Sequence, residues 1–277
     1  MRVVNSSFDA RTMSSQEIDD KIGELTRTGA DVYVVDDVKL KEAKPDLIIA
    51  QGICEVCAPA TNEIRRTSSI LGYKPDILVL DPHDLDDILI SIMDIAQRVD
   101  KVQEGRKLVL SLRTRIDTIR LKIAQNYSKE GNTKPRVLCL EWIDPFFTAG
   151  HWVPQMVDIA GGVNVLSSRG QPSRRITVRE VLESDPDKII MMPCGFDIGR
   201  TLKEVDASNT RDELRSLRAF QNEEVYVVDA GAYFSKPGPR VVTGLEILAK
   251  ISTPELFADV LVPKGSFTRL ITKKNIL

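Results

Sequence analysis

The 277-residue sequence is poor in aromatic residues, has no excess of positive charge and contains no long apolar run. Aromatic side chains make up 5% of the chain and the formal net charge is −2. It therefore lacks the basic face and the stacking platforms that nucleic-acid binding requires. No apolar run approaches the roughly 18 residues of a transmembrane helix. We expect neither a nucleic-acid partner nor a membrane span.

The sequence also lacks a secretion signal and the common catalytic signatures. Residues 1–13 contain no apolar stretch of the signal-peptide kind, so the sequence as given predicts a cytoplasmic protein. There is no phosphate-binding loop, no dinucleotide-binding glycine pattern, no nucleophile elbow and no metalloprotease His-Glu pattern. The acidic residues show no obvious acid/base pair. We therefore expect that the protein is not an enzyme.

Cysteine and histidine are scarce, with four and two residues respectively. Cys54 and Cys57 form a C-x₂-C pair, which in a chain without a secretion signal indicates reduced thiols or metal ligands rather than a disulfide. By itself the pair is better explained by two small buried thiols. A thioredoxin-like redox pair would need its second cysteine at a helix N-terminus.

A near-repeat is the strongest positive feature of the chain. Residues 45–54 and 186–195 each contain Pro-Asp, a short apolar run and a Gly/Cys exit. Such a run, bounded by turn residues, is typical of a strand buried on both faces of a parallel sheet. One copy in each half predicts two similar α/β lobes. Open parallel sheets bind ligands outside the carboxyl ends of their strands, so we expect the cysteines at both exits to line one cleft.

Between the two halves, residues 101–127 place apolar side chains at three- and four-residue steps, with Lys and Arg between them. The pattern predicts one long amphipathic helix that packs across both lobes, in preference to a coiled coil. The expected fold is α/β, with two Rossmann-like lobes that have central parallel sheets and are joined by this backbone helix. The expected parts are an N-terminal lobe at 1–100, the helix and its loop at 101–130, a C-terminal lobe at 131–260 and a loosely docked tail at 261–277.

Local signals predict several helix starts. Ser14 and Thr177 are each followed three residues later by a glutamate, which is the pattern of a capping box. Pro239 is expected in the first turn of a final helix that ends near Ile251.

Residues capable of metal binding follow predicted strands in both halves. His151 comes after the predicted strand 137–141, and Cys194 comes after the predicted strand 189–192. A lone histidine is more often a surface or capping group, but three thiolates and one imidazole are an accepted zinc set. The candidate metal ligands are Cys54, Cys57, His151 and Cys194.

Aromatic residues also fall in turn-rich segments after predicted strands. Most aromatic side chains belong to a core, but in such segments they can form walls for a flat apolar ligand. The candidate ligand-contacting residues are Gln51, Phe146, Phe147, His151, Trp152, Phe196, Tyr233, Phe234 and Arg240.

Several motifs in order carry a family resemblance. They are Leu-Glu-Trp-Ile-Asp-Pro at 140–145, Gly-His-Trp-Val-Pro-Gln-Met at 150–156, Met-Pro-Cys-Gly-Phe at 192–196 and Tyr-Phe-Ser-Lys-Pro-Gly-Pro-Arg at 233–240, with shorter matches at 44–48, 54–57, 81–83 and 160–162. Over residues 3–257 the chain resembles the cobalamin-binding, BtuF-like branch of the class III periplasmic-binding-protein (helical backbone metal receptor) superfamily. Relative to that family, the usual N-terminal strand-helix segment is absent from this sequence.

The resemblance implies two α/β lobes, one backbone helix and a ligand held between the lobes. Members of the family deliver cobalamin, siderophore, haem or metal to an ABC importer and are often periplasmic. Receptors of this kind present one acidic residue on each lobe to the permease. Glu63 stands at the matching position after the first central strand, and Glu204 is the candidate in the second lobe.

Two functions remain open from the sequence. The first is a substrate-binding protein that holds a cobalamin-like corrinoid or another metal chelate for an ABC importer. The second is a cytosolic metal-site protein in which the cysteines and His151 hold zinc, cobalt or iron, either as a carrier or in a chelatase-like or redox enzyme. In a mixed arrangement, His151 would be an axial ligand of the corrinoid cobalt.

Overall fold

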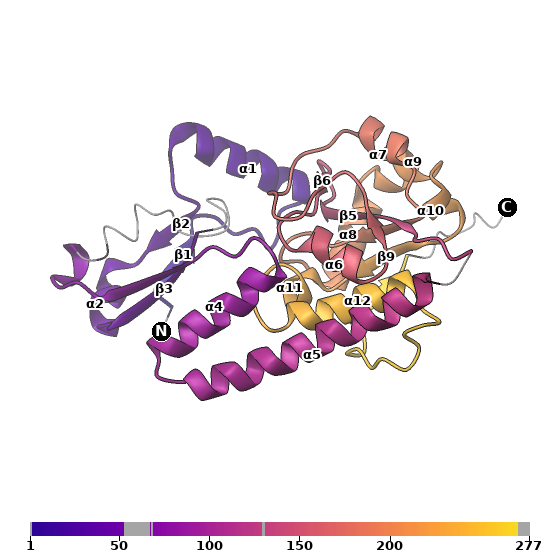
Figure 1. Cartoon of the computed structure of the whole chain (residues 1–277). Coiled ribbons are helices and arrows are strands. Elements are labelled where there is room, and N and C mark those ends of the chain that lie inside the picture. Colours follow the sequence, from indigo (N-terminus) through magenta and orange to yellow (C-terminus); the bar gives the residue numbers. More distant parts are fainter. Residues whose placement is uncertain (1, 53–66, 68, 129–130, 271–277) are drawn as a thin grey trace. The chain divides into compact units, whose positions relative to one another are not determined.

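The chain divides into two compact units. The computed structural model describes residues 2–52, 67, 69–128 and 131–270. Unit 1 comprises Met1–Pro82 and Asp94–Lys101, and unit 2 comprises His83–Met93 and Val102–Leu277. Helix α4 (Leu85–Arg98) contributes residues to both units (Figure 1). The division into an N-terminal lobe, a helix, a C-terminal lobe and a tail at the expected boundaries stays a prediction.

Unit 1 contains two small sheets within its described part. Strands β1 and β2 pair antiparallel, and β3 and β4 pair parallel. A single central parallel sheet was expected in this lobe. Instead, Ile49 of β3 exposes 46% of its surface and Val79 of β4 exposes 49%, so these strands are not buried on both faces among the described residues. The elements are β1 (Val4–Ser6), α1 (Ser15–Thr28), β2 (Tyr33–Val35), α2 (Asp37–Ala43), β3 (Leu47–Gln51) and β4 (Asp76–Leu80).

Helix α1 begins with the predicted capping box. The Ser14 hydroxyl accepts the Glu17 N–H at 3.2 Å, and the Glu17 carboxylate accepts the Ser14 N–H at 2.7 Å. The helix ends at Gly29, which has a φ of 68° and closes the last turn in the left-handed conformation that glycine tolerates. Both ends of this helix are therefore set by local sequence.

Unit 2 is built on a six-stranded mixed sheet with the order β10-β9-β8-β5-β6, and β7 also pairs with β5. Strands β5, β8, β9 and β7 run parallel, as the near-repeat predicts, while β6 and β10 pair antiparallel with β5 and β9. The strands are β5 (Arg136–Trp142), β6 (Phe147–Thr148), β7 (Val163–Asn164), β8 (Lys188–Met191), β9 (Val225–Val228) and β10 (Phe267–Arg269).

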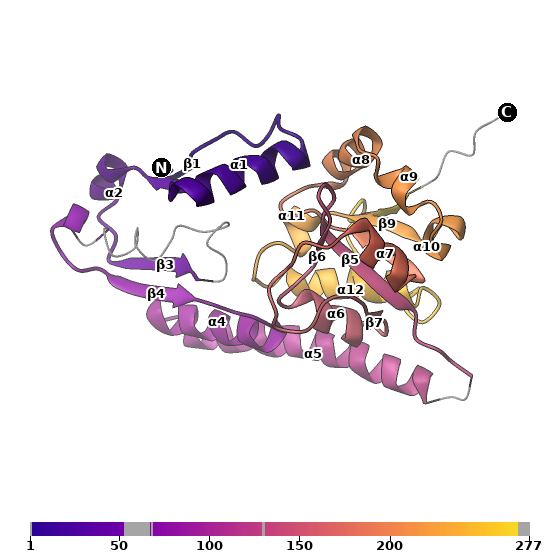
Figure 2. The ribbon, with the colours of Figure 1, turned by 90° about the horizontal axis from the view of Figure 1, so that it is seen from above.

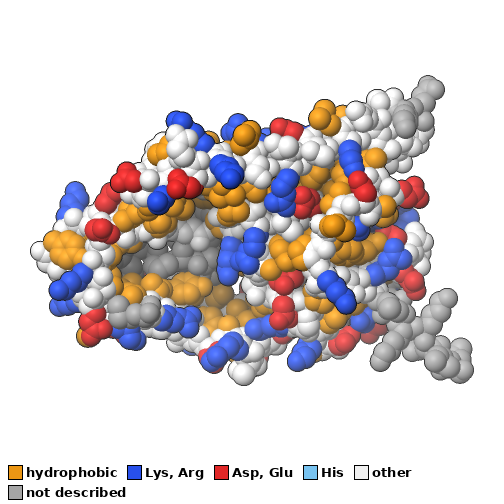
Figure 3. Space-filling model, turned by 90° about the horizontal axis from the view of Figure 1, so that it is seen from below, with side chains coloured by type: hydrophobic (Ala, Val, Ile, Leu, Met, Phe, Trp, Pro, Cys, Tyr) orange, Lys and Arg blue, Asp and Glu red, His pale blue; other side chains and the backbone are white. Residues whose placement is uncertain are grey.

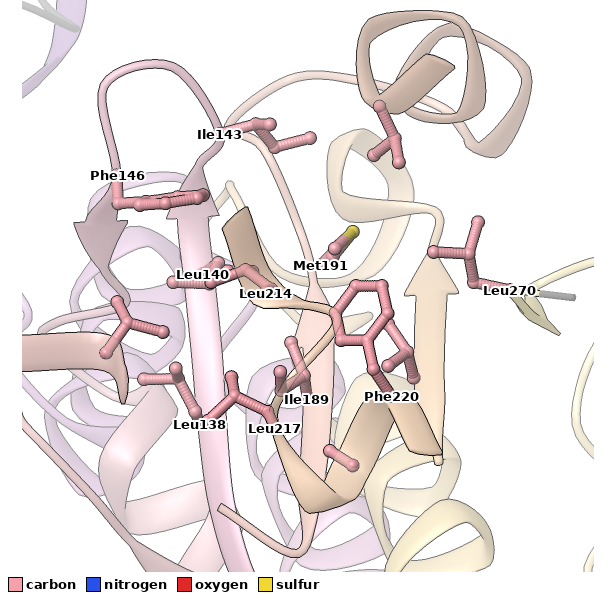
Figure 4. Packing of buried hydrophobic residues seen from close by; sticks show 14 of the residues in the cluster. Leu138, Leu140, Ile143, Phe146, Ile189, Met191, Leu214, Leu217, Phe220 and Leu270 are labelled. Carbon is pink, nitrogen blue, oxygen red and sulfur yellow. The ribbon is translucent and has the colours of Figure 1, made fainter. Parts of the chain in front are cut away.

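A hydrophobic core covers one face of this sheet (Figure 4). Its side chains come from strands β5, β8 and β9 and from the helices and loops that pack over them, and they include Leu138, Leu140, Phe146, Ile189, Met191, Leu214, Leu217, Phe220 and Leu270. Phe146, expected in a ligand wall, is only 4% exposed here. It has almost no surface to offer a ligand, and its place in a ligand wall stays a prediction.

Helix α5 (Val102–Tyr127) is one unbroken helix of 26 residues, as predicted. All of it belongs to unit 2, where it packs beside α12 (Val241–Ser252) and α6 (Val153–Ile159) in both ribbon views (Figures 1 and 2). Its buried apolar residues are Leu112, Ile116, Ile119 and Ile123. Arg115 reinforces the contact with α12 through an ion pair to Glu246 at 2.6 Å. Contact of this helix with the first lobe stays a prediction.

The remaining helices of unit 2 connect or flank the strands. They are α7 (Val178–Ser184), α8 (Ile198–Ala207), α9 (Thr210–Leu214), α10 (Arg218–Gln221) and α11 (Ala230–Tyr233). The predicted capping box of α7 is present, with Thr177 and Glu180 bonded reciprocally. Pro239, expected in the first turn of the last helix, instead precedes its capping residue Arg240.

The segment expected to be a loosely docked tail is partly a strand. Phe267–Arg269 forms β10 at the edge of the sheet, paired antiparallel with β9, and Leu270 is 2% exposed. A three-residue edge strand is too short to show periodicity, so its pairing could not be predicted from local pattern.

Basic and acidic side chains are interspersed on the face shown in Figure 3, consistent with the small net charge. No described helix combines the length and apolar character needed to cross a membrane.

Candidate functional site

Three parallel strands of unit 2, β5, β8 and β9, end at the same edge of the sheet. The chain after them is joined by backbone hydrogen bonds. The Met192 N–H donates to the Leu140 carbonyl at 2.8 Å, and the Cys194 N–H donates to the Glu141 carbonyl at 3.0 Å. Because open parallel sheets bind ligands outside such strand ends, we take the loops after β5, β8 and β9, the strand-exit edge, as the candidate site.

The loop after β8 is held closely against the turn after β9. The Gly231 N–H donates to the Phe196 carbonyl at 3.0 Å, and a Cβ at Gly231 would lie 2.9 Å from the Gly195 carbonyl oxygen. The Gly195 N–H donates to the Ser235 hydroxyl at 2.9 Å. The loop that carries Cys194 is therefore positioned by backbone and side-chain contacts with the chain after β9.

Aromatic rings and arginines meet at this edge. The rings of Trp142 and Phe196 lie 5.2 Å apart between centroids, tilted by 58°. The Arg200 guanidinium lies 3.9 Å from the centre of the Phe196 ring, and the Arg175 guanidinium lies 5.4 Å from that of Phe147. Phe196 is buried, while Trp142 and Phe147 are partly exposed. Such an arrangement can stack on a flat ligand and attract its negative groups.

Three predicted aromatic wall residues differ in exposure. Trp152 and Phe234 are 5% and 3% exposed, and the Trp152 indole N–H donates to the Phe234 carbonyl at 3.0 Å. Both are buried, as Phe196 is, and their contact with a ligand stays a prediction. Tyr233, at the end of α11, is partly exposed and remains a candidate.

His151 sits on a tightly held loop between β6 and α6. The backbone N–H of His151 donates to the Gln171 carbonyl at 2.7 Å, and the backbone carbonyl of His151 accepts the Gly170 N–H at 3.0 Å. The Gly150 N–H donates to the Glu141 carboxylate at 3.2 Å. His151 has a φ of 54°, which is uncommon for a residue with a side chain, although histidine tolerates it better than most. The His151 side chain is partly exposed, and the hydrogen bonds of its backbone hold it in position.

The cysteines differ in their surroundings. Cys194 is partly exposed at the exit of β8, whereas Cys139 is buried in β5, where desolvation raises the pKa of its thiol. Cys54 and Cys57 lie outside the described residues. In the described part of the chain, no three His, Cys, Asp or Glu side chains come together to hold a metal ion. The predicted four-ligand metal site stays a prediction.

The other predicted site residues are spread over both units. Gln51 ends β3 in unit 1 and is partly exposed. Arg240 is exposed at the N-cap of α12, and Glu204 lies partly exposed in α8. Glu63 is outside the described residues.

Sequence reasoning missed Trp142 and Arg200 as site residues. Trp142 is the last residue of β5. The expectation that ligands bind outside the carboxyl ends of parallel strands could therefore have identified it. Arg200 lies within α8 rather than in the preceding loop, and its place over Phe196 follows only from the three-dimensional structure.

Comparison with curated sequences finds relatives that are vitamin B12-binding proteins. The chain is 24% identical over 212 residues to a vitamin B12-binding protein of Vibrio cholerae serotype O1, an alignment that covers 75% of this chain and 68% of that protein.

Solved structures agree in fold. The chain is similar to a periplasmic haem-binding protein from Pseudomonas aeruginosa, with a TM-score of 0.69, 16% identity and coverage of 86% of this chain and 82% of that one. It is also similar to the periplasmic vitamin B12-binding protein BtuF of Vibrio cholerae, with a TM-score of 0.60, 21% identity and coverage of 80% and 79%. An ABC transporter substrate-binding protein from Listeria monocytogenes has a TM-score of 0.63, 20% identity and coverage of 80% and 81%. The mixed α/β architecture is thus that of periplasmic binding proteins.

A family model described as periplasmic binding protein matches residues 20–232, most of the chain. It agrees with the resemblance found in the motifs, whereas the cytoplasmic location expected from the sequence stays a prediction. The chain belongs to the periplasmic binding protein family, whose members bind substrates and are not enzymes.

Proposed function

We propose that the chain is the substrate-binding protein of an ABC importer and that it binds a corrinoid of the cobalamin type. The observation that carries the proposal is the group of aromatic rings and arginines at the strand-exit edge of unit 2. Partly exposed Trp142 and Phe147 supply flat apolar faces. Arg200 and Arg175 supply cations beside Phe196 and Phe147.

These groups suit a large metal-bearing macrocycle with polar or acidic groups at its rim. Aromatic faces stack on a flat conjugated ring, and guanidinium groups pair with peripheral carboxylates or phosphates. Two of the similar proteins bind macrocycles of this class: vitamin B12 in Vibrio cholerae and haem in Pseudomonas aeruginosa. The sequence match to the vitamin B12-binding protein favours a corrinoid over haem. A contribution from Gln51, in unit 1, stays part of the proposal.

A panel of ligands tests the proposal. Tag-free protein is titrated with cyanocobalamin, haemin and a ferric siderophore, and binding is followed by visible absorbance and by calorimetry. We expect saturable one-to-one binding of cyanocobalamin, tighter than binding of the other two by tenfold or more. Tighter binding of haemin or of the siderophore would keep the receptor role and overturn the corrinoid. Failure of all three to bind would overturn both.

A metal-site function is the second candidate. It is favoured by the presence of both His151 and Cys194 beside the strand-exit edge, on segments held by backbone hydrogen bonds. In this candidate Cys54 and Cys57 complete the set around zinc, cobalt or iron. The double variant Cys54→Ser/Cys57→Ser is then expected to lose most of the metal measured in the purified wild-type protein. Unchanged metal content would leave these cysteines as packing residues.

Docking to a permease is proposed through Glu204 of α8, together with Glu63. Glu204→Ala is expected to lower uptake of the ligand by cells that depend on this protein, while the affinity of the purified protein stays unchanged. Normal uptake in that variant would remove Glu204 from the docking surface.

A further inference from the structure

The only two histidines of the chain, His83 and His151, lie next to each other although they are far apart in sequence. Their ring centroids are 6.0 Å apart and the ring planes are tilted by 42°. Both residues belong to unit 2. His83 is exposed and His151 is partly exposed.

The backbone of His83 is anchored at the start of α4. Its N–H donates to the Asp87 carboxylate at 2.9 Å, and the Asp87 N–H donates to the Asp84 carboxylate at 2.9 Å. The Leu85 N–H donates to the Gln155 side-chain oxygen on α6 at 2.8 Å. The first turn of α4 is therefore fixed to the helix that directly follows the His151 loop.

A charged link holds the same two regions together. Arg169, next to the segment that binds the His151 backbone, pairs with Asp84 at 2.5 Å and with Asp86 at 3.3 Å. Burial raises the pKa of Asp84, but its hydrogen bonds from the Asp87 N–H and Arg169 lower it further, so the net shift is downward and the carboxylate stays ionised. The backbone segments that carry the two imidazoles, the start of α4 and the His151 loop, are thus linked to each other.

The spacing of the rings fits two imidazoles on one metal ion. When a nitrogen of each ring points at the ion, a metal–nitrogen distance of about 2.1 Å and about 1.2 Å from nitrogen to ring centre put the centroids roughly 4.7 to 6.6 Å apart, for angles from a right angle to linear. The observed 6.0 Å falls within this range.

We propose that His83 and His151 form a two-imidazole site for a divalent transition metal ion of the kind that imidazole prefers, Cu²⁺, Ni²⁺ or Zn²⁺. Because no third His, Cys, Asp or Glu joins such a group within the described residues, the ion keeps positions for solvent or for another ligand. The carboxylates of Asp84, Asp86 and Asp87 give the surroundings of His83 the negative charge that favours a cation. The site includes no thiolate, so it differs from the predicted cysteine site, and it does not depend on corrinoid binding.

The test is a metal titration of the full chain without a histidine tag. Cu²⁺ and Ni²⁺ are titrated by calorimetry in a non-coordinating buffer, and the Cu²⁺ form is examined by electron paramagnetic resonance for nitrogen ligands. We expect one bound equivalent with two nitrogen ligands. His83→Ala and His151→Asn should each weaken binding by tenfold or more. Asparagine is chosen at 151 because it tolerates the positive φ.

Glu183→Gln is the control, since it removes an exposed ion-pairing carboxylate of α7 but neither imidazole. We expect it to bind the metal as the wild type does, and circular dichroism of each variant without metal should match the wild type. No binding by the wild type, or wild-type affinity in His83→Ala or in His151→Asn, would overturn the two-imidazole site.

Discussion

At residue 150 the fold has no room for a side chain. A Cβ built on Gly150 would lie 2.2 Å from the Ser173 nitrogen and 2.5 Å from the Pro172 carbonyl carbon. These are backbone atoms of a segment that also hydrogen-bonds the backbone of His151, so neither side can move independently. The position of the His151 side chain therefore depends on a glycine one residue earlier.

Gly150→Ala should lower the free energy of unfolding by about 1–3 kcal/mol, because the added methyl group overpacks the loop. Urea unfolding of the purified variant measures the change. The matched control is Gly199→Ala in α8, where the new Cβ would lie 3.5 Å from the Asp197 carboxylate and alanine favours the helix. Equal unfolding midpoints for Gly150→Ala and wild type would contradict the close packing of this loop.

The buried amide of Gln155 is the second sensitive residue. Gln155 is 5% exposed and accepts the Leu85 N–H. Gln155→Leu keeps most of the volume but leaves that N–H without its acceptor, which should cost about 1–3 kcal/mol of unfolding free energy. Gln125→Leu, on the exposed side of α5, is the control and should be nearly neutral. A thermal midpoint for Gln155→Leu equal to that of the control would show that this hydrogen bond contributes little.

At the scale of elements, α5 shows how a regular pattern determines a buried stripe. Leu112 is 2% exposed, whereas Leu110, two residues earlier on the same helix, is 67% exposed. The chemistry of the two side chains is identical, so only their place on the helix distinguishes them.

Leu112→Ala should therefore destabilise the protein by about 2–5 kcal/mol, through lost burial and the cavity it leaves. Leu110→Ala should change the unfolding free energy by no more than about 0.5 kcal/mol. Denaturant unfolding of the two variants side by side measures the difference, and similar effects would mean that the stripe is not the packed face of α5.

The capping box of α7 predicts a dependence on pH. The pKa of Glu180 is lowered from 4.5 to about 2, first by the hydrogen bond from the Thr177 N–H and then by Arg174. Because the folded pKa is depressed, the stabilisation is complete above about pH 4.5 and is lost as pH falls toward 2. Glu180→Gln should be less stable than wild type at pH 7, with a gap that shrinks by pH 3. Glu183→Gln, which removes only an exposed ion pair with Arg179, is the control. An equal stability difference between Glu180→Gln and wild type at pH 7 and pH 3 would contradict the lowered pKa of Glu180.

Elements with local signals could be predicted, and those that depend on distant partners could not. The capping boxes at Ser14 and Thr177, the strands of the near-repeat and the long helix all follow from short-range pattern. Strand β10 depends on its pairing with β9, which no local pattern shows. The strand-exit edge could be predicted as a place, but the exposure of each aromatic ring could not, since buried Phe146 and partly exposed Phe147 are neighbours in sequence.

At the scale of the whole molecule, membership of the periplasmic binding protein family and the aromatic–arginine group of unit 2 lead to one central claim. The proposed ligand is a corrinoid, bound at the strand-exit edge with Trp142 as a stacking face. The claim requires both that the ligand binds and that it binds at this place.

Calorimetric titration with cyanocobalamin of wild type, Trp142→Ala and Arg179→Ala tests both requirements together. Arg179 is the control because its side chain is 85% exposed on α7 and, within the described residues, forms its ion pair with Glu183 alone. We predict one-to-one binding by wild type and by Arg179→Ala, and at least tenfold weaker binding by Trp142→Ala, a loss of about 1.4 kcal/mol or more. Undetectable binding by wild type, or equal affinity of Trp142→Ala and wild type, would contradict the claim.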